Sequence, residues 1–253
     1  MKPVKQFSSI ELPNALRDAL VVQQFDAHLN NVYLIELDGK KYILKIASGE
    51  SRSKELRHEV KLLNELQNII KVPKLVDCGA SGQYFWVLTE FIDGIIIEKN
   101  TLNHDILAKL ANILKKLHNT CVARETDYDF LLRTAKDNMK NNRLDKAEFL
   151  INGEYKQPSE LLQWLNTNKP TSASKAKLLH GDFRPKNMIV RSDNIYLIDF
   201  GLSFIGDEYY DLAVFKYYLT DDDFAYFCEK YGIDKIDEGR LYFAEILSKF
   251  LNV

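Results

Sequence analysis

The segment from His180 to Asn187 constrains the fold of this chain more than any other part of its sequence. It consists of His-Gly-Asp-Phe-Arg-Pro-Lys-Asn, and Asp-Phe-Gly follows at Asp199–Gly201. Between them, two short apolar runs flank a polar turn at residues 191–194, a pattern that predicts a β-hairpin. A single Asp or Asn beside a strand is usually a turn former. The combination of Asp182, Asn187 and Asp199 in this order and at this spacing is much harder to explain by turns alone. The hairpin would begin after Asn187 and end before Asp199, so we expect these two side chains to lie close together.

In order and spacing, these motifs resemble those of the protein-kinase-like superfamily. The resemblance implies that Asp182 orients an attacking hydroxyl group and accepts its proton. It also implies that Asn187 and Asp199 hold Mg²⁺ ions that bridge the phosphates of ATP. Arg184 occupies the place of a phosphate-contacting lysine of Ser/Thr protein kinases, where a guanidinium group could bind the γ-phosphate in bidentate fashion. A solvent-facing loop arginine is the alternative for Arg184.

The amino-terminal part of the chain predicts a second β-hairpin. Asp38-Gly39 separates two apolar runs at residues 32–37 and 42–46, and Asp-Gly between such runs is a strong hairpin signal. Lys45 lies on the second run and matches the kinase lysine that contacts the α- and β-phosphates. Taken alone, Lys45 would be an exposed lysine of an edge strand.

A helix is expected to follow and to supply a partner for Lys45. Residues 53–70 carry apolar side chains at helical spacing. Two glutamates in this stretch are candidates for pairing with Lys45. We favour Glu59, in the middle of the helix beside the apolar stripe. Glu55 falls in the first turn, where a carboxylate suits the helix dipole.

The run at residues 84–94 predicts a strand that ends in a polar connector, like the adenine-binding hinge of kinases. By resemblance, the Glu90 carbonyl and the Ile92 amide would bind the adenine edge. The implied architecture is a two-lobed α+β fold of the protein-kinase type. A small lobe with a sheet and one helix would cover residues 1–91, and a mostly helical lobe with the catalytic loop and the acceptor site would cover residues 92–253.

Two departures from protein kinases narrow this assignment. No glycine-rich loop is present at residues 25–33, although Asn30 and Asn31 tolerate unusual backbone angles and offer amide groups to a nucleotide. Only nine residues separate Gly201 from Asp211, which leaves no room for the activation segment of an ordinary protein kinase.

Over nearly its full length, the chain therefore resembles the aminoglycoside phosphotransferase and choline kinase-like family. That resemblance implies Mg²⁺-dependent transfer of the γ-phosphate of ATP to a hydroxyl group of an aminoglycoside-, choline- or sugar-like molecule. The choice between ATP and GTP stays open. Asp211 would cap a buried helix and brace the catalytic loop. The matching segments are residues 30–34, 44–45, 72–73, 107–118, 180–182, 198–201 and 210–213.

Two alternatives remain at the level of the sequence. Residues 187–190 and 195–205 are also similar to the small kinase subunit of the tRNA-modifying KEOPS complex, a protein Ser/Thr kinase or ATPase. The segment 119–177 argues against this alternative, because a minimal kinase would not need it. Within this segment, residues 127–151 are predicted to be mostly helical and residues 159–165 to form a second short helix. The second alternative is a nucleotide-binding module without catalytic activity, although every catalytic position is filled.

The chain after Gly201 contains eleven acidic and five basic residues, including Asp221, Asp222 and Asp223. An acidic wall would suit a cationic acceptor, and a solvated helical surface would have the same composition. These two interpretations stay open.

Composition excludes several classes of function. A net charge of −2 shows no basic bias that would indicate binding to nucleic acid. No apolar run approaches the roughly 18 residues of a membrane span, and the start of the chain lacks the apolar core of a signal peptide. We expect a cytoplasmic protein whose oligomeric state stays open. Cysteine and histidine show no metal-binding spacing. The cysteines are expected to be reduced packing residues (Cys78, Cys121, Cys228), and four histidines to lie at the surface or in helices (His28, His58, His104, His118).

Overall fold

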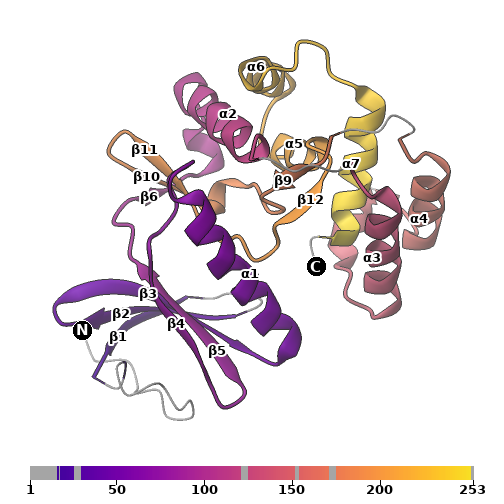
Figure 1. Cartoon of the computed structure of the whole chain (residues 1–253). Coiled ribbons are helices and arrows are strands. Elements are labelled where there is room, and N and C mark those ends of the chain that lie inside the picture. Colours follow the sequence, from indigo (N-terminus) through magenta and orange to yellow (C-terminus); the bar gives the residue numbers. More distant parts are fainter. Residues whose placement is uncertain are drawn as a thin grey trace. The chain divides into compact units, whose positions relative to one another are not determined.

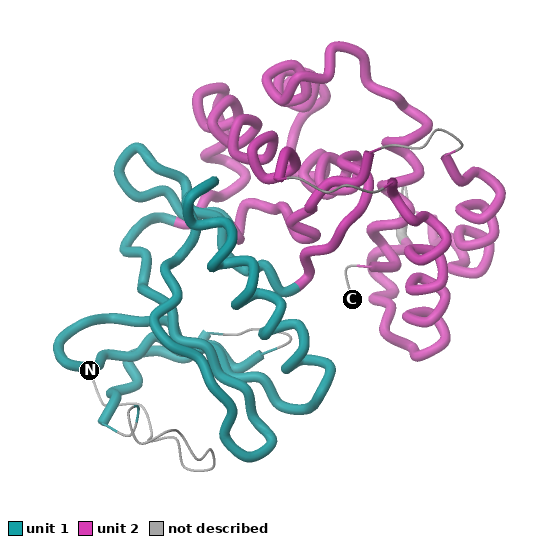
Figure 2. Tube along the Cα trace, in the orientation of Figure 1, with its two compact units in different colours: residues 1–95, 188–201 teal, residues 96–187, 202–253 magenta. Residues whose placement is uncertain are grey.

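The computed structural model describes residues 16, 18–25, 30–120, 125–151, 154–170 and 175–251. Cys121, His28 and the loop residues 171–174 lie outside them. The chain forms two compact units, coloured separately in Figure 2. The first unit comprises residues 1–95 and 188–201, and the second comprises 96–187 and 202–253. A lobe boundary at residue 91 stays a prediction.

The first unit is built on a five-stranded antiparallel sheet in the order β1-β2-β3-β5-β4 (Figure 1). Helix α1 (Glu50–Leu66) packs against one face of it, where Leu56 meets Phe85 and Val87 in a buried cluster. The strands are β1 (Leu20–Phe25), β2 (Asn31–Leu37), β3 (Lys40–Ser48), β4 (Leu75–Ser81) and β5 (Tyr84–Glu90).

The turn between β2 and β3 is the one that Asp38-Gly39 predicts. Both residues have positive φ angles, 51° at Asp38 and 71° at Gly39, as a tight hairpin turn of this kind requires. Alternation along β3 then divides its side chains between the two faces of the sheet. Leu44 and Ile46 pack with Trp86 on the face opposite α1, so Lys45 points toward α1.

The predicted hairpin after Asn187 is also present. Strands β10 (Met188–Arg191) and β11 (Asn194–Leu197) pair in antiparallel register, with Met188 opposite Leu197. The Leu197 amide donates a hydrogen bond of 3.0 Å to the Lys71 carbonyl, which ties the hairpin to the segment after α1. The short strand β6 (Ile95–Ile96) lies beside β10, where the first unit ends.

The second unit is mostly helical (Figure 1). Helices α3, α4, α5 and α7 surround one buried cluster, to which Leu131, Leu165, Val214 and Phe250 contribute. Helix α2 packs against α6. The helices are α2 (His104–His118), α3 (Tyr128–Lys140), α4 (Pro158–Thr167), α5 (Tyr209–Lys216), α6 (Asp221–Tyr231) and α7 (Glu238–Leu251). The shorter elements are η2 (Lys99–Thr101), η3 (Lys146–Phe149), η4 (Pro185–Asn187), β7 (Leu150–Ile151), β8 (Glu154–Tyr155), β9 (Lys177–Leu179) and β12 (Phe204–Gly206).

Residues 127–151, which are predicted to be mostly helical, contain α3 and the short helix η3. Helix α3 ends at Lys140, because Asn142 adopts a left-handed φ of 54° and the Asn141 side chain donates to the Asp137 carbonyl at 2.8 Å. Asparagine is one of the few residues that adopts this conformation readily. Residues 159–165 are helical as predicted, within α4.

Two further sequence-based expectations concern packing and membranes. Cys78 and Cys228 carry free thiols, and burial raises the pKa of Cys228 to about 12, which fits a packing residue. Among the described residues, no helix has the length and apolar character needed to cross a membrane.

Candidate active site

In the first unit, Lys45 contacts two carboxylates. Its Nζ donates to Glu59 Oε1 at 2.7 Å and Oε2 at 3.0 Å, and to Asp199 Oδ1 at 2.9 Å. Glu59 lies on the buried stripe of α1, directly opposite the face of β3 that presents Lys45. The structure therefore brings Glu59, and not Glu55, to the lysine.

Burial and charge act in opposite directions on this cluster. Burial alone would lower the pKa of Lys45, but the neighbouring Asp199 and Glu59 carboxylates outweigh it and raise that pKa above its usual range. Burial raises the pKa of Glu59, while Lys45 acts to lower it. The Glu59 side chain is 5% exposed, that of Lys45 15% and that of Asp199 51%. The lysine is thus held as an ammonium group, and Asp199 is the member of the cluster that solvent and ligands reach.

Asp199 owes its position to an unusual backbone conformation. Its φ is 67°, which Asp and Asn adopt more readily than other residues with a side chain. The next residue, Phe200, is fully buried, and its amide donates a hydrogen bond to the Glu59 carboxylate. The Asp-Phe-Gly segment is thereby fixed to the same glutamate that holds Lys45.

We predict that Lys45 and Glu59 act as a unit. Lys45→Ala should lower the rate of ATP use by about two orders of magnitude, since a charge aimed at the phosphates is lost. Glu59→Gln should lower it less, and the double variant should be little worse than Lys45→Ala alone. Steady-state kinetics of all three variants measures this. Glu55→Gln, one turn earlier on α1, is the matched control and should keep most of the activity. Strictly additive losses in the double variant would contradict the prediction that Lys45 and Glu59 act together.

In the second unit, Asp182 is held by the loop that follows it. Asn187 Nδ2 donates to Asp182 Oδ2 at 2.8 Å and to the Asp182 carbonyl at 2.9 Å. Arg184 Nε forms an ion pair with Asp182 Oδ1, and Lys186 Nζ lies 3.7 Å from Oδ2. Asp182 and Asn187 are buried, so this carboxylate is oriented by an amide and faces two cations.

Glycine is required before Asp182. Gly181 has a φ of 80°, and a Cβ at this position would overlap the carbonyl oxygen of Leu202. The His-Gly-Asp sequence therefore reflects a close approach between two backbone segments of the second unit.

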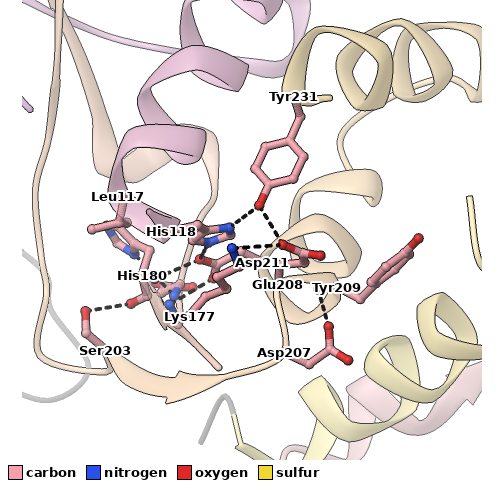
Figure 3. Close-up of polar contacts among 12 residues, drawn as sticks. Leu117, His118, Lys177, His180, Ser203, Asp207, Glu208, Tyr209, Asp211 and Tyr231 are labelled. Carbon is pink, nitrogen blue, oxygen red and sulfur yellow. Dashed lines mark hydrogen bonds and ion pairs between the residues drawn. The ribbon is translucent and has the colours of Figure 1, made fainter. Parts of the chain in front are cut away.

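A buried hydrogen-bond network supports the backbone of His180 and Gly181 (Figure 3). The Asp211 carboxylate accepts hydrogen bonds from the amides of His180 at 2.7 Å and Gly181 at 2.9 Å, and contacts His118 Nε2 at 3.0 Å. His118 Nδ1 lies 2.8 Å from the Tyr231 hydroxyl, which donates to Glu208 Oε2 at 3.0 Å. Asp211 and His118 are almost completely buried. Helices α2, α5 and α6 are thus joined to the backbone that carries Asp182.

Asp211 braces the loop that begins at His180, as expected, but its predicted capping role is wrong. The residue before α5 is Glu208, whose side chain makes no capping hydrogen bond, and Asp211 is the third residue inside the helix. The contribution of His118 and Tyr231 to this network was not predicted from the sequence. His118 continues the stripe of buried leucines at Leu114 and Leu117 in α2, and that helical spacing is the signal that could have placed it in the interior.

Breaking this network should lower stability in proportion to the bonds that are lost. Asp211→Asn removes a buried charge that accepts two backbone hydrogen bonds, and the free energy of unfolding should fall by about 2 kcal/mol or more. Tyr231→Phe keeps both of those bonds and should cost only about 1 kcal/mol. Urea unfolding of both variants measures the difference. Equal losses would contradict a bracing role that is centred on Asp211.

The residues predicted to contact the nucleotide base and phosphates lie at the ends of strands. Glu90 closes β5, where its Oε1 accepts from the Lys74 amide at 3.1 Å, and Ile92 is buried two residues later. Asn31 begins β2, and the buried Asn30 Oδ1 accepts no hydrogen bond from the described part of the chain. Their contacts with a nucleotide stay predictions.

The acidic run after Gly201 forms the first turn of α6. Thr220 caps this helix by accepting from the Asp223 amide at 3.1 Å. Asp223 also pairs with His104 at 3.4 Å, while Asp221 and Asp222 are exposed. Acidic residues at the start of a helix interact favourably with the helix dipole, so the run also has a structural role.

Comparisons with known proteins agree with this geometry. A family model for the phosphotransferase enzyme family matches residues 21–243. An aminoglycoside 3'-phosphotransferase of Niallia circulans is 27% identical over 245 residues, which cover 91% of this chain and 92% of the relative.

Two solved structures share the fold. An aminoglycoside phosphotransferase from Streptomyces rimosus in complex with ADP and streptomycin has a TM-score of 0.72 at 21% identity, covering 87% of this chain and 90% of that one. The choline kinase LicA from Streptococcus pneumoniae has a TM-score of 0.68 at 19% identity, covering 92% and 83%. The predicted two-lobed α+β fold of the kinase type is confirmed.

Proposed function

Because this chain belongs to the phosphotransferase enzyme family, it is a small-molecule kinase that transfers a phosphoryl group from ATP to a hydroxyl group, and we propose which residues carry the reaction. Two polar clusters, one in each unit, support the proposed residue roles. Lys45 is paired with Glu59 and Asp199 in the first unit, and Asp182 is paired with Asn187 in the second. The family match favours this function over a KEOPS-type protein kinase and over a non-catalytic module.

The first unit would hold the phosphates. Lys45, kept charged and oriented by Glu59, binds the α- and β-phosphate oxygens of ATP. Asp199, in the first unit, supplies a half-exposed carboxylate, and Asn187, in the second unit, supplies an amide oxygen. Oxygen ligands of this kind, together with phosphates, are what Mg²⁺ prefers, so each residue has the chemistry of a magnesium ligand. Bound Mg²⁺ would neutralise the charge on the phosphates.

Asp182 would act on the acceptor. Its carboxylate orients the hydroxyl group and accepts the proton that leaves as the oxygen attacks the γ-phosphorus. Asn187 donates a hydrogen bond to one carboxylate oxygen of Asp182, and Arg184 forms an ion pair with the other. Arg184 could also bind the γ-phosphate, because a guanidinium group has donors on more than one edge.

We further propose that the Glu90 carbonyl and the Ile92 amide bind the adenine edge, and that the backbone at Asn30 and Asn31 covers the phosphates. The ADP bound to the aminoglycoside phosphotransferase from Streptomyces rimosus supports an adenine nucleotide for this enzyme. Since the reaction consumes ATP, we place the enzyme in the cytoplasm, where ATP is supplied.

Direct detection of product tests this function. The purified protein is incubated with Mg²⁺, ATP and pools of hydroxyl-bearing small molecules, and mass spectrometry records any compound that gains one phosphate. We expect transfer that requires Mg²⁺ and is lost in Lys45→Ala. ATP binding without Lys45-dependent transfer to any pool would contradict the proposal.

A further inference from the structure

A cavity of about 590 Å³ lies in the second unit, between helices α5 and α7. Arg184, which contacts Asp182, forms part of its wall, and Val214 and Ile246 supply an apolar part. Small-molecule sites usually have a volume in this range. The cavity therefore lies beside the residue that is proposed to activate the acceptor.

Tyrosines are the prominent side chains of this cavity. Tyr217, Tyr218 and Tyr242 all line it. Burial raises the pKa of Tyr218, which lies close enough to Arg184 and Asp182 for their charges to act on it. Tyr242 is held by an edge-to-face contact with Trp164, with ring centroids 4.9 Å apart. These rings offer flat apolar faces and hydroxyl groups to a ligand.

The charges around the cavity cancel. Its wall contains three basic residues and two acidic ones. Lys216 Nζ binds Glu245 Oε1 at 2.7 Å, and Arg184 is paired with Asp182, outside the lining. Glu148 and Lys249 remain, with opposite charges. A wall of this kind creates no negative field, so an acceptor with several ammonium groups would lose hydration without gaining matching partners.

We propose that the acceptor is a neutral polyhydroxylated ring, of the sugar or cyclitol class, that lies against Tyr218 and Tyr242. This inference rests on the proposed function, because it names the acceptor of the same reaction. A neutral ring uses the apolar ring faces for contact and the paired charged groups and phenol hydroxyls for hydrogen bonds. The acidic residues Asp221 and Asp222 take no part in binding it.

The test compares acceptor classes with one another. Neutral hexoses, pentoses and cyclitols are assayed beside kanamycin and choline, with ATP and Mg²⁺. We expect kcat/KM for the best neutral ring to exceed that for either amine about tenfold or more. Its KM should change by less than about twofold between about 50 and about 300 mM salt, because no charge on the ligand is screened. A higher kcat/KM for kanamycin or choline, falling with salt, would overturn the inference.

Variants locate the binding surface. Tyr218→Ala and Tyr242→Ala should each raise the KM for the neutral acceptor by about tenfold, the worth of one aromatic contact, and leave the KM for ATP unchanged. Tyr155→Ala is the matched control for Tyr242, because both tyrosines are 45% exposed and Tyr155 does not line the cavity. The double variant Asp221→Asn/Asp222→Asn should leave the KM for the acceptor unchanged. An acceptor KM that rises in this double variant and not in the tyrosine variants would also overturn the inference.

A binding measurement covers the case in which none of these compounds is phosphorylated. Saturation-transfer NMR should show neutral rings binding to the wild-type protein and losing that signal in Tyr218→Ala. Absence of any Tyr218-dependent signal would overturn the inference. Failure of the proposed function is recognised separately, by the absence of Lys45-dependent transfer to every acceptor, amines included.

Discussion

Asp199→Asn is expected to lower the rate of phosphate transfer by about two to three orders of magnitude, which is the usual loss when one transition-state charge clamp is removed. Asparagine is the appropriate replacement, because Asp199 has a φ of 67° and asparagine tolerates this conformation where alanine would add backbone strain. The carboxylate is half exposed, so its loss should change the free energy of unfolding little. The measurement is turnover as a function of Mg²⁺ concentration, with thermal unfolding of the same samples.

Asp193→Asn provides the matched control for this prediction. Asp193 lies exposed in the turn of the same hairpin, so its replacement removes an equal charge without touching Lys45. Wild-type turnover is expected for it. If Asp199→Asn kept near-normal, magnesium-dependent turnover, Asp199 would not be a metal ligand.

Much of the first unit could be predicted from the sequence because its elements depend on local sequence patterns. Asp-Gly between two apolar runs requires a tight turn, and alternation along β3 then decides which face Lys45 occupies. Glu59 follows in turn, since the buried stripe of α1 must face the sheet. Each step uses residues that are neighbours in the sequence or on one element.

The bracing of the catalytic loop could not be predicted in the same way. Asp211 contacts the amides of His180 and Gly181, which lie about thirty residues earlier in the chain. A local reading assigns such an aspartate to a helix cap. Tyr231 reaches His118 across 113 residues, and nothing in the sequence near either residue signals that contact.

Charge composition alone could not decide between an acceptor site and a solvated surface for a related reason. The acidic run at 221–223 stands out in the sequence, yet it begins a helix and helps to cap it. The residues that line the cavity are scattered from Ala147 to Lys249, and the fold pairs Lys216 with Glu245 and Arg184 with Asp182. A field at a site depends on which charges are paired, and pairing is a property of the fold.

Asp182→Asn is expected to keep nucleotide binding and to lower transfer to any acceptor by about two to four orders of magnitude, the contribution of a positioned general base. The amide of an asparagine can still accept from Asn187, so the loop should keep its conformation. It cannot accept the proton of the hydroxyl group. Single-turnover transfer and titration with a nucleotide analogue measure the two effects separately.

Arg184→Gln separates the loss of a base from the loss of an ion pair. In the wild-type protein, Arg184 Nε faces Asp182 Oδ1, and asparagine at position 182 would leave that guanidinium without its carboxylate. If the damage in Asp182→Asn came only from this lost pair, Arg184→Gln would reduce transfer just as much. We expect instead that Arg184→Gln mainly raises the KM for ATP and reduces the single-turnover rate far less than Asp182→Asn. Equal single-turnover rates in the two variants would assign the carboxylate to holding Arg184 and remove it from proton transfer.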